Sequence, residues 1–175
     1  MNNKENFQLI TWSNTFCCGI KLIDDQHKNL VNLVNDMFNH VTGNEEHEQK
    51  YLNKVIQEAV KYIKLHFSTE EKIMLAAKFT GYAVHKRAHD NFILTVADII
   101  SESKTGKRVS LYTFTKFLKD WILSHIAVMD KQYFVFLKQI ATQKANGKLT
   151  ITLEDVQAAA NPKRENAMSD VVVNS

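Results

Sequence analysis

Residues that interrupt helices are scarce in this chain of 175 residues, which contains 5 glycines and 1 proline. Strand-like alternation of polar and apolar residues is also missing from the long stretches rich in Lys, Glu, Ala and Leu. The pattern therefore indicates an all-α fold. With 45% hydrophobic and 23% charged residues, the chain can bury the core of a single globular domain.

Cysteine and long hydrophobic runs are scarce as well. The two cysteines, Cys17 and Cys18, are adjacent, so they form neither a CxxC redox motif nor a zinc site. We interpret them as small apolar residues of an N-terminal arm that precedes the first helix. The amino terminus lacks a basic start followed by an apolar run, and no segment reaches the length of a membrane span. We therefore expect a cytoplasmic protein that has no membrane partner.

Charge of one sign does not accumulate along the chain. The 22 basic and 19 acidic residues are intermixed and give a formal net charge of +3. A surface dedicated to nucleic acid would need a basic stripe or patch. We expect no nucleic-acid partner and a monomeric protein, and the sequence does not identify a protein partner.

Four segments carry apolar residues at steps of three and four, which is the signature of a helical face turned toward a core. These segments are residues 24–41, 48–75, 84–102 and 111–137. The connectors between them are short and polar, and each contains a glycine. Because short connectors make consecutive helices antiparallel neighbours, we expect an up-down-up-down four-helix bundle with an N-terminal arm and a C-terminal extension.

The periodic pattern weakens near the C-terminal end of the fourth segment. We therefore assign residues 1–140 to the bundle with its arm and residues 141–175 to a tail. The tail contains a candidate short helix at residues 155–160 and the single proline, Pro162. It is expected either to dock on the bundle or to be partly disordered.

Polar side chains interrupt each apolar stripe at positions that ought to be hydrophobic. Isolated buried imidazoles and carboxylates are destabilising by several kcal/mol unless something compensates them. A bound metal ion would compensate all of them together. The residues concerned are His27, His66, Glu70, His85, His89 and His125.

Two pairs of these residues are separated by four positions, which brings their side chains nearly above one another on a helix. His66 and Glu70 form one pair, and His85 and His89 form the other. An HxxxH pair also occurs on solvated helix faces, so one pair alone does not identify a metal site. Because both pairs lie in phase with the apolar stripes, together they favour a metal site at the centre of the bundle.

The first and fourth helices each contribute one in-phase histidine, His27 and His125. A single core histidine is usually a hydrogen-bonded structural residue, but five histidines in phase with four stripes favour metal binding. Asp130 follows His125 by five residues, which an ideal α-helix rotates by about 140°. Periodicity alone therefore does not place Asp130 as a ligand. His40 and His47 lie off the pattern, and we assign them to the surface.

The type and number of candidate ligands indicate which metal would bind. Five imidazoles and two carboxylates are too many for one tetrahedral zinc, and no thiolate is in phase with them. Two octahedral ions bridged by the carboxylates fit better, and these ligands suit both iron and manganese. The chain contains neither the ExxH motif of ferritin-like di-iron proteins nor the HExxH motif of zinc proteases.

Five features occur in the chain in a fixed order: Trp12, GIKLIDDQHKNL (Gly19–Leu30), HFSTEEKIM (His66–Met74), HKRAH (His85–His89) and HIAVMD (His125–Asp130). Together they resemble the bacterial hemerythrins, and the similarity covers about residues 12–137. The chain departs from the family at Cys18, where an aliphatic residue is usual, and in its longer tail. Neither departure affects a ligand motif, and the tail leaves an accessory role open.

The resemblance implies a non-heme di-iron centre whose two irons share an oxo or hydroxo bridge. Three histidines would bind one iron, two would bind the other, and two carboxylates would bridge the pair. In that order the residues are His85, His89 and His125; His27 and His66; and Glu70 and Asp130. The iron with two imidazoles would keep an open position, and the resemblance implies that dioxygen binds there.

Reversible binding of dioxygen requires a position that excludes water and protons. We predict that apolar side chains close to the histidines in sequence line a gas pocket, although ordinary core packing would explain each of them equally well. These side chains are Leu30, Phe67, Trp121, Ile122 and Ile126.

The expected function is that of a dioxygen carrier, store or donor, which is a binding protein and not an enzyme. A first alternative is an oxygen or redox sensor that acts through a partner, and the absence of an attached signalling domain disfavours it. A second alternative is a di-iron enzyme that reduces peroxide or nitric oxide. The predicted pocket lacks a polar acid–base group, which disfavours the enzyme.

Overall fold

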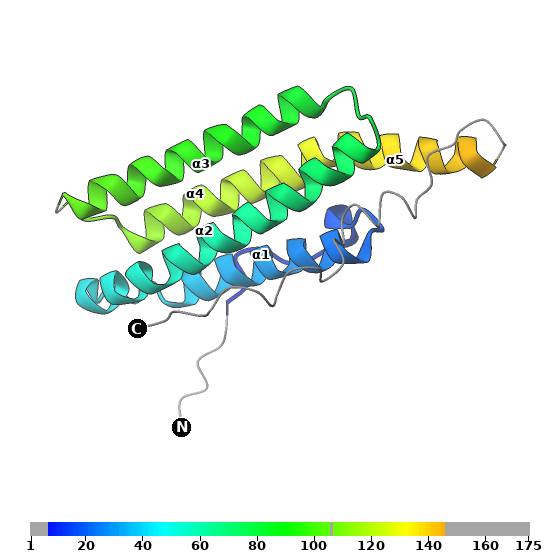
Figure 1. Ribbon diagram of the computed structural model, residues 1–175. Coiled ribbons are helices and arrows are strands. Elements are labelled where there is room, and N and C mark those ends of the chain that lie inside the picture. The colour runs from blue at the N-terminus through cyan, green and yellow to red at the C-terminus, as the bar shows by residue number, and fades with distance from the viewer. Residues whose placement is uncertain (1–6, 106, 146–175) are drawn as a thin grey trace, which may run out of the picture.

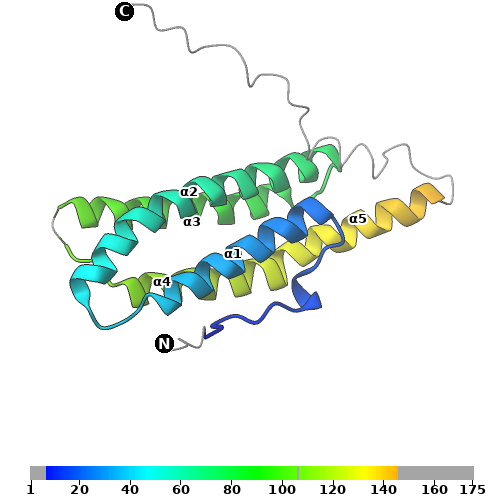
Figure 2. The same ribbon diagram turned by 90° about the horizontal axis from the view of Figure 1, so that it is seen from below.

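The computed structural model describes residues 7–105 and 107–145, which form an antiparallel bundle of three helices and one longer helical rod (Figures 1 and 2). The three helices are α1 (Lys21–Asn39), α2 (Glu45–Ala76) and α3 (Tyr82–Lys104). The rod consists of α4 (Leu111–Ser124), the π-helix η2 (His125–Met129) and α5 (Asp130–Ala145). The predicted all-α four-helix bundle is therefore confirmed.

Two of the helices begin at side-chain caps. The Asn44 side chain accepts a hydrogen bond from the His47 N–H at the start of α2, and Ser110 accepts one from Thr113 at the start of α4. Such caps satisfy N–H groups that have no partner within the helix. They explain why both helices begin directly after a polar connector.

Most helix ends lie slightly beyond the ranges expected from periodicity, because end residues need not face the core, whereas α1 ends at Asn39, two residues before the expected end at Val41. The largest difference is at the C-terminal end, where α5 continues to Ala145 instead of ending near Leu137. The first residues of the expected tail are therefore helical. The candidate helix at residues 155–160 and Pro162 lie outside the described residues.

The apolar core consists of two clusters of buried side chains. α1 packs against α2 and α4, and α2 packs against α3. Leu30 and Phe67 belong to the larger cluster, whereas Ile23 and Ile73 belong to the smaller one. On both α1 and α2 the predicted metal ligands fall between members of the two clusters, so the candidate site divides the core into two apolar parts.

The N-terminal arm is fastened to α1 by two asparagines that lie four residues apart. The Asn35 side chain accepts from the Ile10 N–H and donates to the Ile10 carbonyl oxygen, both at 2.9 Å. Asn39 makes the same pair of contacts with Phe7, at 3.0 and 3.1 Å. The arm then forms the short 3-10 helix η1 (Asn14–Phe16), which contacts η2. The arm thus runs from one end of α1 to the candidate site.

Among the residues described, 7–105 and 107–145, no helix combines the length and the hydrophobicity needed to cross a lipid bilayer.

Candidate metal centre

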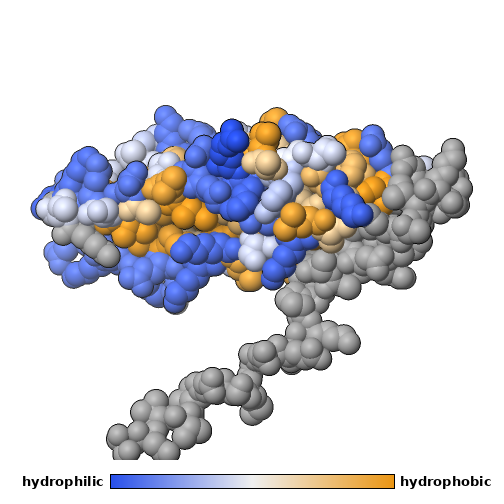
Figure 3. Space-filling model, turned by 45° about the horizontal axis from the view of Figure 1, so that its top comes forward, coloured by the Kyte–Doolittle hydropathy of each residue, from blue (hydrophilic) through white to orange (hydrophobic). Residues whose placement is uncertain are grey.

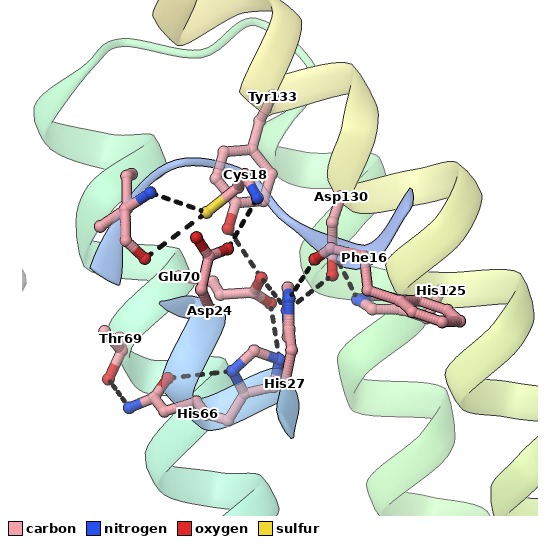
Figure 4. A network of polar contacts seen from close by, with 12 residues as sticks. Phe16, Cys18, Asp24, His27, His66, Thr69, Glu70, His125, Asp130 and Tyr133 are labelled. Carbon is pink, nitrogen blue, oxygen red and sulfur yellow. Dashed lines mark hydrogen bonds and ion pairs between the residues drawn. The ribbon is translucent and has the colours of Figure 1, made fainter. Parts of the chain in front are cut away.

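All seven predicted ligands converge on one buried cluster inside the bundle, part of which is drawn in Figure 4. None of the seven residues is more than 3% exposed. Each main helix contributes: His27 from α1, His66 and Glu70 from α2, His85 and His89 from α3, and His125 and Asp130 from the rod.

Three of the imidazoles form what we call the three-histidine group: His85, His89 and His125. The Nε2 atom of His89 lies 3.2 Å from that of His85 and 2.9 Å from that of His125. Two ligands at right angles on one ion, each about 2.1 Å from it, would lie about 3.0 Å apart. The three nitrogens are therefore spaced as ligands of a single cation. Glu70 Oε2 completes the group at 3.3 Å from the His89 Nε2.

The other two imidazoles form the two-histidine group, His27 and His66. The His66 Nε2 lies 3.5 Å from Glu70 Oε2, and the His27 Nε2 lies 3.3 Å from Asp130 Oδ2. One ligand atom from each of these four residues can be chosen so that all lie within 4.8 Å of one another. The cluster therefore offers a second position for a cation, and Glu70 belongs to both positions.

Asp130 lies between the two groups. Its Oδ1 is 3.2 Å from the His125 Nε2 and 3.3 Å from the His85 Nε2, whereas its Oδ2 faces His27. One carboxylate oxygen thus points to each group, as a bridging ligand requires.

The π-helix η2 explains why Asp130 reaches the cluster although an ideal α-helix would turn it away. The Asp130 N–H donates to the His125 carbonyl oxygen, which is an i→i+5 hydrogen bond. This wider turn brings residues five apart onto the same face. Single π-turns of this kind frequently occur at functional sites.

The buried polar atoms of the cluster test whether a metal fits. His27 Nε2, His66 Nε2, Glu70 Oε2 and both Asp130 carboxylate oxygens have no hydrogen-bond partner. Buried polar atoms are nearly always satisfied, and unsatisfied ones are strongly destabilising. All five atoms are potential metal donors, so cations at the centre would satisfy them together.

Comparison with known proteins identifies the family of this chain. A family model for the hemerythrin HHE cation binding domain matches residues 18–137. The chain belongs to the hemerythrin family. The resemblance expected from the sequence motifs is therefore confirmed.

Individual hemerythrins are similar over most of the chain. A bacteriohemerythrin from Methylococcus capsulatus is 32% identical over 127 residues, which cover 71% of this chain and 94% of that relative. A myohemerythrin from Sipunculus nudus is 31% identical over 123 residues, covering 70% of this chain and 88% of that relative. A crystal structure of wild-type hemerythrin gives a TM-score of 0.64 at 31% identity and covers 74% of this chain and 98% of that chain.

Hemerythrins are oxygen-binding proteins and not enzymes, and the relatives carry the names of hemerythrins. The expectation that the chain is a binding protein without turnover is confirmed at the level of the family.

Hydrogen bonds at the outer nitrogens orient the two imidazoles of the two-histidine group. The His27 Nδ1 lies 3.1 Å from the Phe16 carbonyl oxygen of the arm, and the His66 Nδ1 lies 3.0 Å from Gln26 Oε1. Because these oxygens only accept, each Nδ1 must carry the proton, which leaves the Nε2 lone pair free for a metal. Thr69 in turn accepts a hydrogen bond of 3.3 Å from Gln26 Nε2 and so fixes the amide. Figure 4 shows this chain of contacts.

The remaining supports come from residues that the sequence patterns did not single out. His89 Nδ1 lies 3.1 Å from Glu71 Oε1, and the Tyr133 hydroxyl donates a hydrogen bond of 2.7 Å to Glu70 Oε1. Burial and the charges of nearby carboxylates raise the pKa of Tyr133 well above its ordinary value. The phenol therefore remains a proton donor. Its position three residues after Asp130 was the signal that could have identified it.

The electrostatics show how the metal-free cluster balances its charge. Burial alone would lower the pKa of His27 and His85. The negative charges of Asp130 and Glu70, whose carboxylate oxygens lie close to both imidazoles, outweigh burial and raise the pKa values to about 10 and about 9. Burial lowers the pKa of His66 to about 4. In neutral solution two protonated imidazoles therefore face two carboxylates, where cations could take the place of protons.

The carboxyl groups show the complementary effect. Burial would raise the pKa of Glu70 and of Asp130, but the surrounding imidazoles outweigh it and hold both values below the ordinary range. Both side chains remain ionised, which is the form that binds a metal.

The residues predicted to line a gas pocket surround the cluster in the larger apolar core. The Phe67 ring is stacked on His89 at 3.7 Å between ring centroids, and the Trp121 ring is stacked on His125 at 4.3 Å. These two rings therefore cover the three-histidine group. Leu30, Ile122 and Ile126 are at most 3% exposed. Their part in a gas pocket stays a prediction.

The other cysteines and histidines lie where the sequence interpretation placed them. Cys18 is buried in the smaller apolar cluster, and Cys17 is half-buried, consistent with apolar packing in the arm. Burial raises the pKa of the Cys18 thiol, which keeps it protonated and unreactive. His40 is partly exposed and stacks on Tyr51, and His47 is exposed. Neither histidine contacts the metal centre.

Proposed function

We propose that this chain is a non-heme di-iron protein that binds dioxygen reversibly as a carrier, store or local donor. The division of five inward-facing imidazoles into groups of three and two around two shared carboxylates carries this proposal. The three-histidine group would hold one iron and the two-histidine group the other, with Glu70 and Asp130 between them. An oxo or hydroxo bridge would complete the centre.

When bound, the two iron ions would supply the electrons and the open coordination position that reversible dioxygen binding requires. The unequal number of imidazoles supports this assignment, because an octahedral ion with fewer protein ligands keeps a position free. The two bridging side chains are charged at neutral pH and would offset part of the charge of the cations.

The protein itself would keep the open position dry. Leu30, Phe67 and Ile126 are buried and offer no proton, so water and protons are excluded from their part of the core. Tyr133 holds its proton toward Glu70 Oε1 and not toward the apolar side. A carrier needs this exclusion because water and protons promote oxidation of the ferrous centre.

A sensor is the second candidate because the arm contacts a proposed ligand directly. The Phe16 carbonyl oxygen accepts a hydrogen bond from His27, so a movement of His27 would change the position of the arm. Hydrogen exchange at the arm, compared with and without dioxygen, tests this alternative. Identical exchange in the two states would leave the carrier as the better proposal.

Reversible gas binding provides the main test of the function. Iron-loaded protein is reduced without air, dioxygen is admitted, and the visible charge-transfer absorption is followed while the sample is flushed with argon. A colour that appears and then disappears over repeated cycles supports a carrier. Bleaching with product formation in a single cycle would instead support an enzyme and contradict the proposal.

A ligand substitution tests the site without relying on gas binding. His66→Ala should reduce the iron content from two ions to about one per chain, because it removes half of the two-histidine group. His40→Ala serves as the matched control, since His40 is partly exposed and outside the cluster. Retention of two ions by His66→Ala would contradict the ligand assignment.

The expected cytoplasmic location and monomeric state remain predictions.

A further inference from the structure

An apolar groove of about 340 Å³ runs between α2 and α3. Most of its lining is apolar, with Val60 and Ile63 of α2 on one wall and Phe92, Val96 and Ala97 of α3 on the other. Lys64 and Ser101 are the two polar residues that line it. Figure 3, which brings the α3 side of the bundle forward, shows a hydrophobic area on this face framed by hydrophilic residues. The seven predicted ligands are not among the residues that line the groove.

An unbroken series of aromatic rings connects this groove with the metal cluster. Phe92, which lines the groove and is 3% exposed, meets Phe67 edge to face at 5.8 Å between ring centroids. Phe67 in turn is stacked on His89 and lies 5.9 Å from the His66 ring. Ile63, Phe67, Phe92 and Val96 belong to one apolar cluster. A small apolar molecule in the groove is thus separated from two proposed ligands by two side-chain rings.

We propose that this groove is the access site for dioxygen, in which the gas first collects before it passes between Phe92 and Phe67 to the cluster. This inference rests on the proposed function. Dioxygen is small and apolar, so it partitions from water into apolar space. An enclosed apolar cavity of about 150 Å³ binds xenon, which shows that apolar space inside a protein retains small apolar gases.

The chemistry of the path also explains its selectivity. Ions and hydrated protons are not stable in an apolar passage because they lose their hydration there. Two other surface pockets are less suitable because most of their lining is polar: Glu45, Lys50 and Arg108 are among the lining residues of one, and Asn35, Asp36 and His47 of the other. Lys64 is the only charged residue among those that line the α2–α3 groove. The α2–α3 groove would therefore admit the gas and exclude the species that oxidise a ferrous centre.

Xenon binding to the metal-free protein tests the groove without any gas chemistry at iron. Methyl resonances of Val60 and Val96 should shift as xenon pressure rises, whereas those of Val84, which is 65% exposed on α3 and lines none of the pockets described, should not. Filling the groove by Ala97→Trp should abolish the shifts. Absence of any xenon-dependent shift at Val60 and Val96 would overturn the inference.

The rate of gas binding tests the path. In iron-loaded protein, Ala97→Trp should slow dioxygen association and dissociation equally, each by at least about threefold, and leave the affinity unchanged. Equal slowing is expected because the indole raises the barrier between outside and inside without altering either end state. Ala83→Trp is the matched control, since Ala83 is exposed on the same helix and does not line the groove.

The outcomes separate the two proposals. Wild-type protein that binds no dioxygen would refute the proposed function, whereas normal binding with unchanged rates in Ala97→Trp would refute only the access site. Sedimentation provides the remaining check. If wild-type protein dimerises and Ala97→Trp abolishes the dimer, the groove is a contact between two copies, and the inference is overturned.

Discussion

The three-histidine group and the two-histidine group are supported by different kinds of partner. On the three-histidine side, His89 Nδ1 faces the carboxylate of Glu71, which is partly exposed. On the two-histidine side, His27 faces a backbone carbonyl oxygen and His66 faces the neutral amide of Gln26. In the three-histidine group His89 therefore has a charged acceptor, while His125 Nδ1 has no hydrogen-bond partner; in the two-histidine group both imidazoles have neutral acceptors.

This difference predicts unequal behaviour of the two proposed metal positions. A carboxylate that accepts from the outer nitrogen raises the basicity of an imidazole, and neutral acceptors do so less. The stacked rings of Phe67 and Trp121 also cover the three-histidine side. That side should hold its ion more tightly, while the two-histidine side is left with fewer ligands and weaker donors, as an open binding position requires.

The largest expected effect is a loss of affinity at both proposed metal positions together. Glu70 belongs to both groups, so Glu70→Gln should lower the affinity for both ions by more than about 100-fold. This exceeds the loss that is usual for residues that only support a ligand. Calorimetric titration of metal-free protein with Co²⁺, combined with metal analysis, measures it. Glu58→Gln is the control, since Glu58 is exposed on the same helix. Loss of only one ion would show that Glu70 is not shared.

The second effect is the release of protons when the metals bind. His27 and His85, one from each group, have pKa values of about 10 and about 9 in the metal-free protein. Near pH 7 both must lose a proton to bind, so the product of the two binding constants should fall about 100-fold for each unit of pH lowered. Titration in buffers of different ionisation enthalpy counts the protons. Release of none would contradict the charge balance described above.

The same pKa values fix the sign of the pH dependence of stability without metal. Because the pKa values of His27 and His85 are raised, their contribution is fully present below about pH 6.5 and is lost as pH rises through 9 to 10. His66, with its pKa lowered to about 4, makes stability fall as pH drops from 6.5 toward 4. The thermal midpoint of the metal-free protein should therefore be highest near pH 6.5, which a pH series of melting curves can check.

Periodicity predicted the four helical segments because each must turn one apolar face to the core. The same reasoning found His27, His66 and Glu70, since a polar residue within an apolar stripe is conspicuous. It could not place Asp130, because a π-turn is a local departure from the 3.6-residue repeat that periodicity assumes. The family resemblance supplied that residue, and the i→i+5 hydrogen bond now gives the physical reason.

The sequence patterns did not single out the supporting residues, because these residues contact ligands on neighbouring helices. Gln26 and Glu71 each follow or precede a predicted ligand in sequence, and nothing in the repeat distinguishes them from ordinary polar neighbours. Their partners, His66 and His89, lie on other helices, so the contacts depend on how the helices are rotated and spaced. The α2–α3 groove has the same origin, because it is a property of two packed surfaces.

The third effect is a loss of metal affinity in one histidine group at a time. Glu71→Gln should lower the affinity of the three-histidine position, and Gln26→Ala that of the two-histidine position, each by about 10- to 100-fold. Stepwise titration with Co²⁺ resolves the two ions, because their affinities are expected to differ. If either substitution weakened both positions equally, the two groups would not be independently supported.

The smallest effect concerns the Tyr133 hydroxyl, which donates to Glu70, a member of both groups. The ring of Tyr133 meets the His85 ring edge to face at 5.6 Å, and phenylalanine keeps that contact. In the metal-free protein Tyr133→Phe leaves Glu70 Oε1 without its hydrogen bond, which should lower the free energy of unfolding by about 1 kcal/mol. Denaturant unfolding measures this loss, and Tyr112→Phe, on an exposed ring, is the control. Because the phenol constrains a ligand common to both ions, the variant should weaken both positions by similar factors. A loss confined to one position would mean that Glu70 serves one group more than the other.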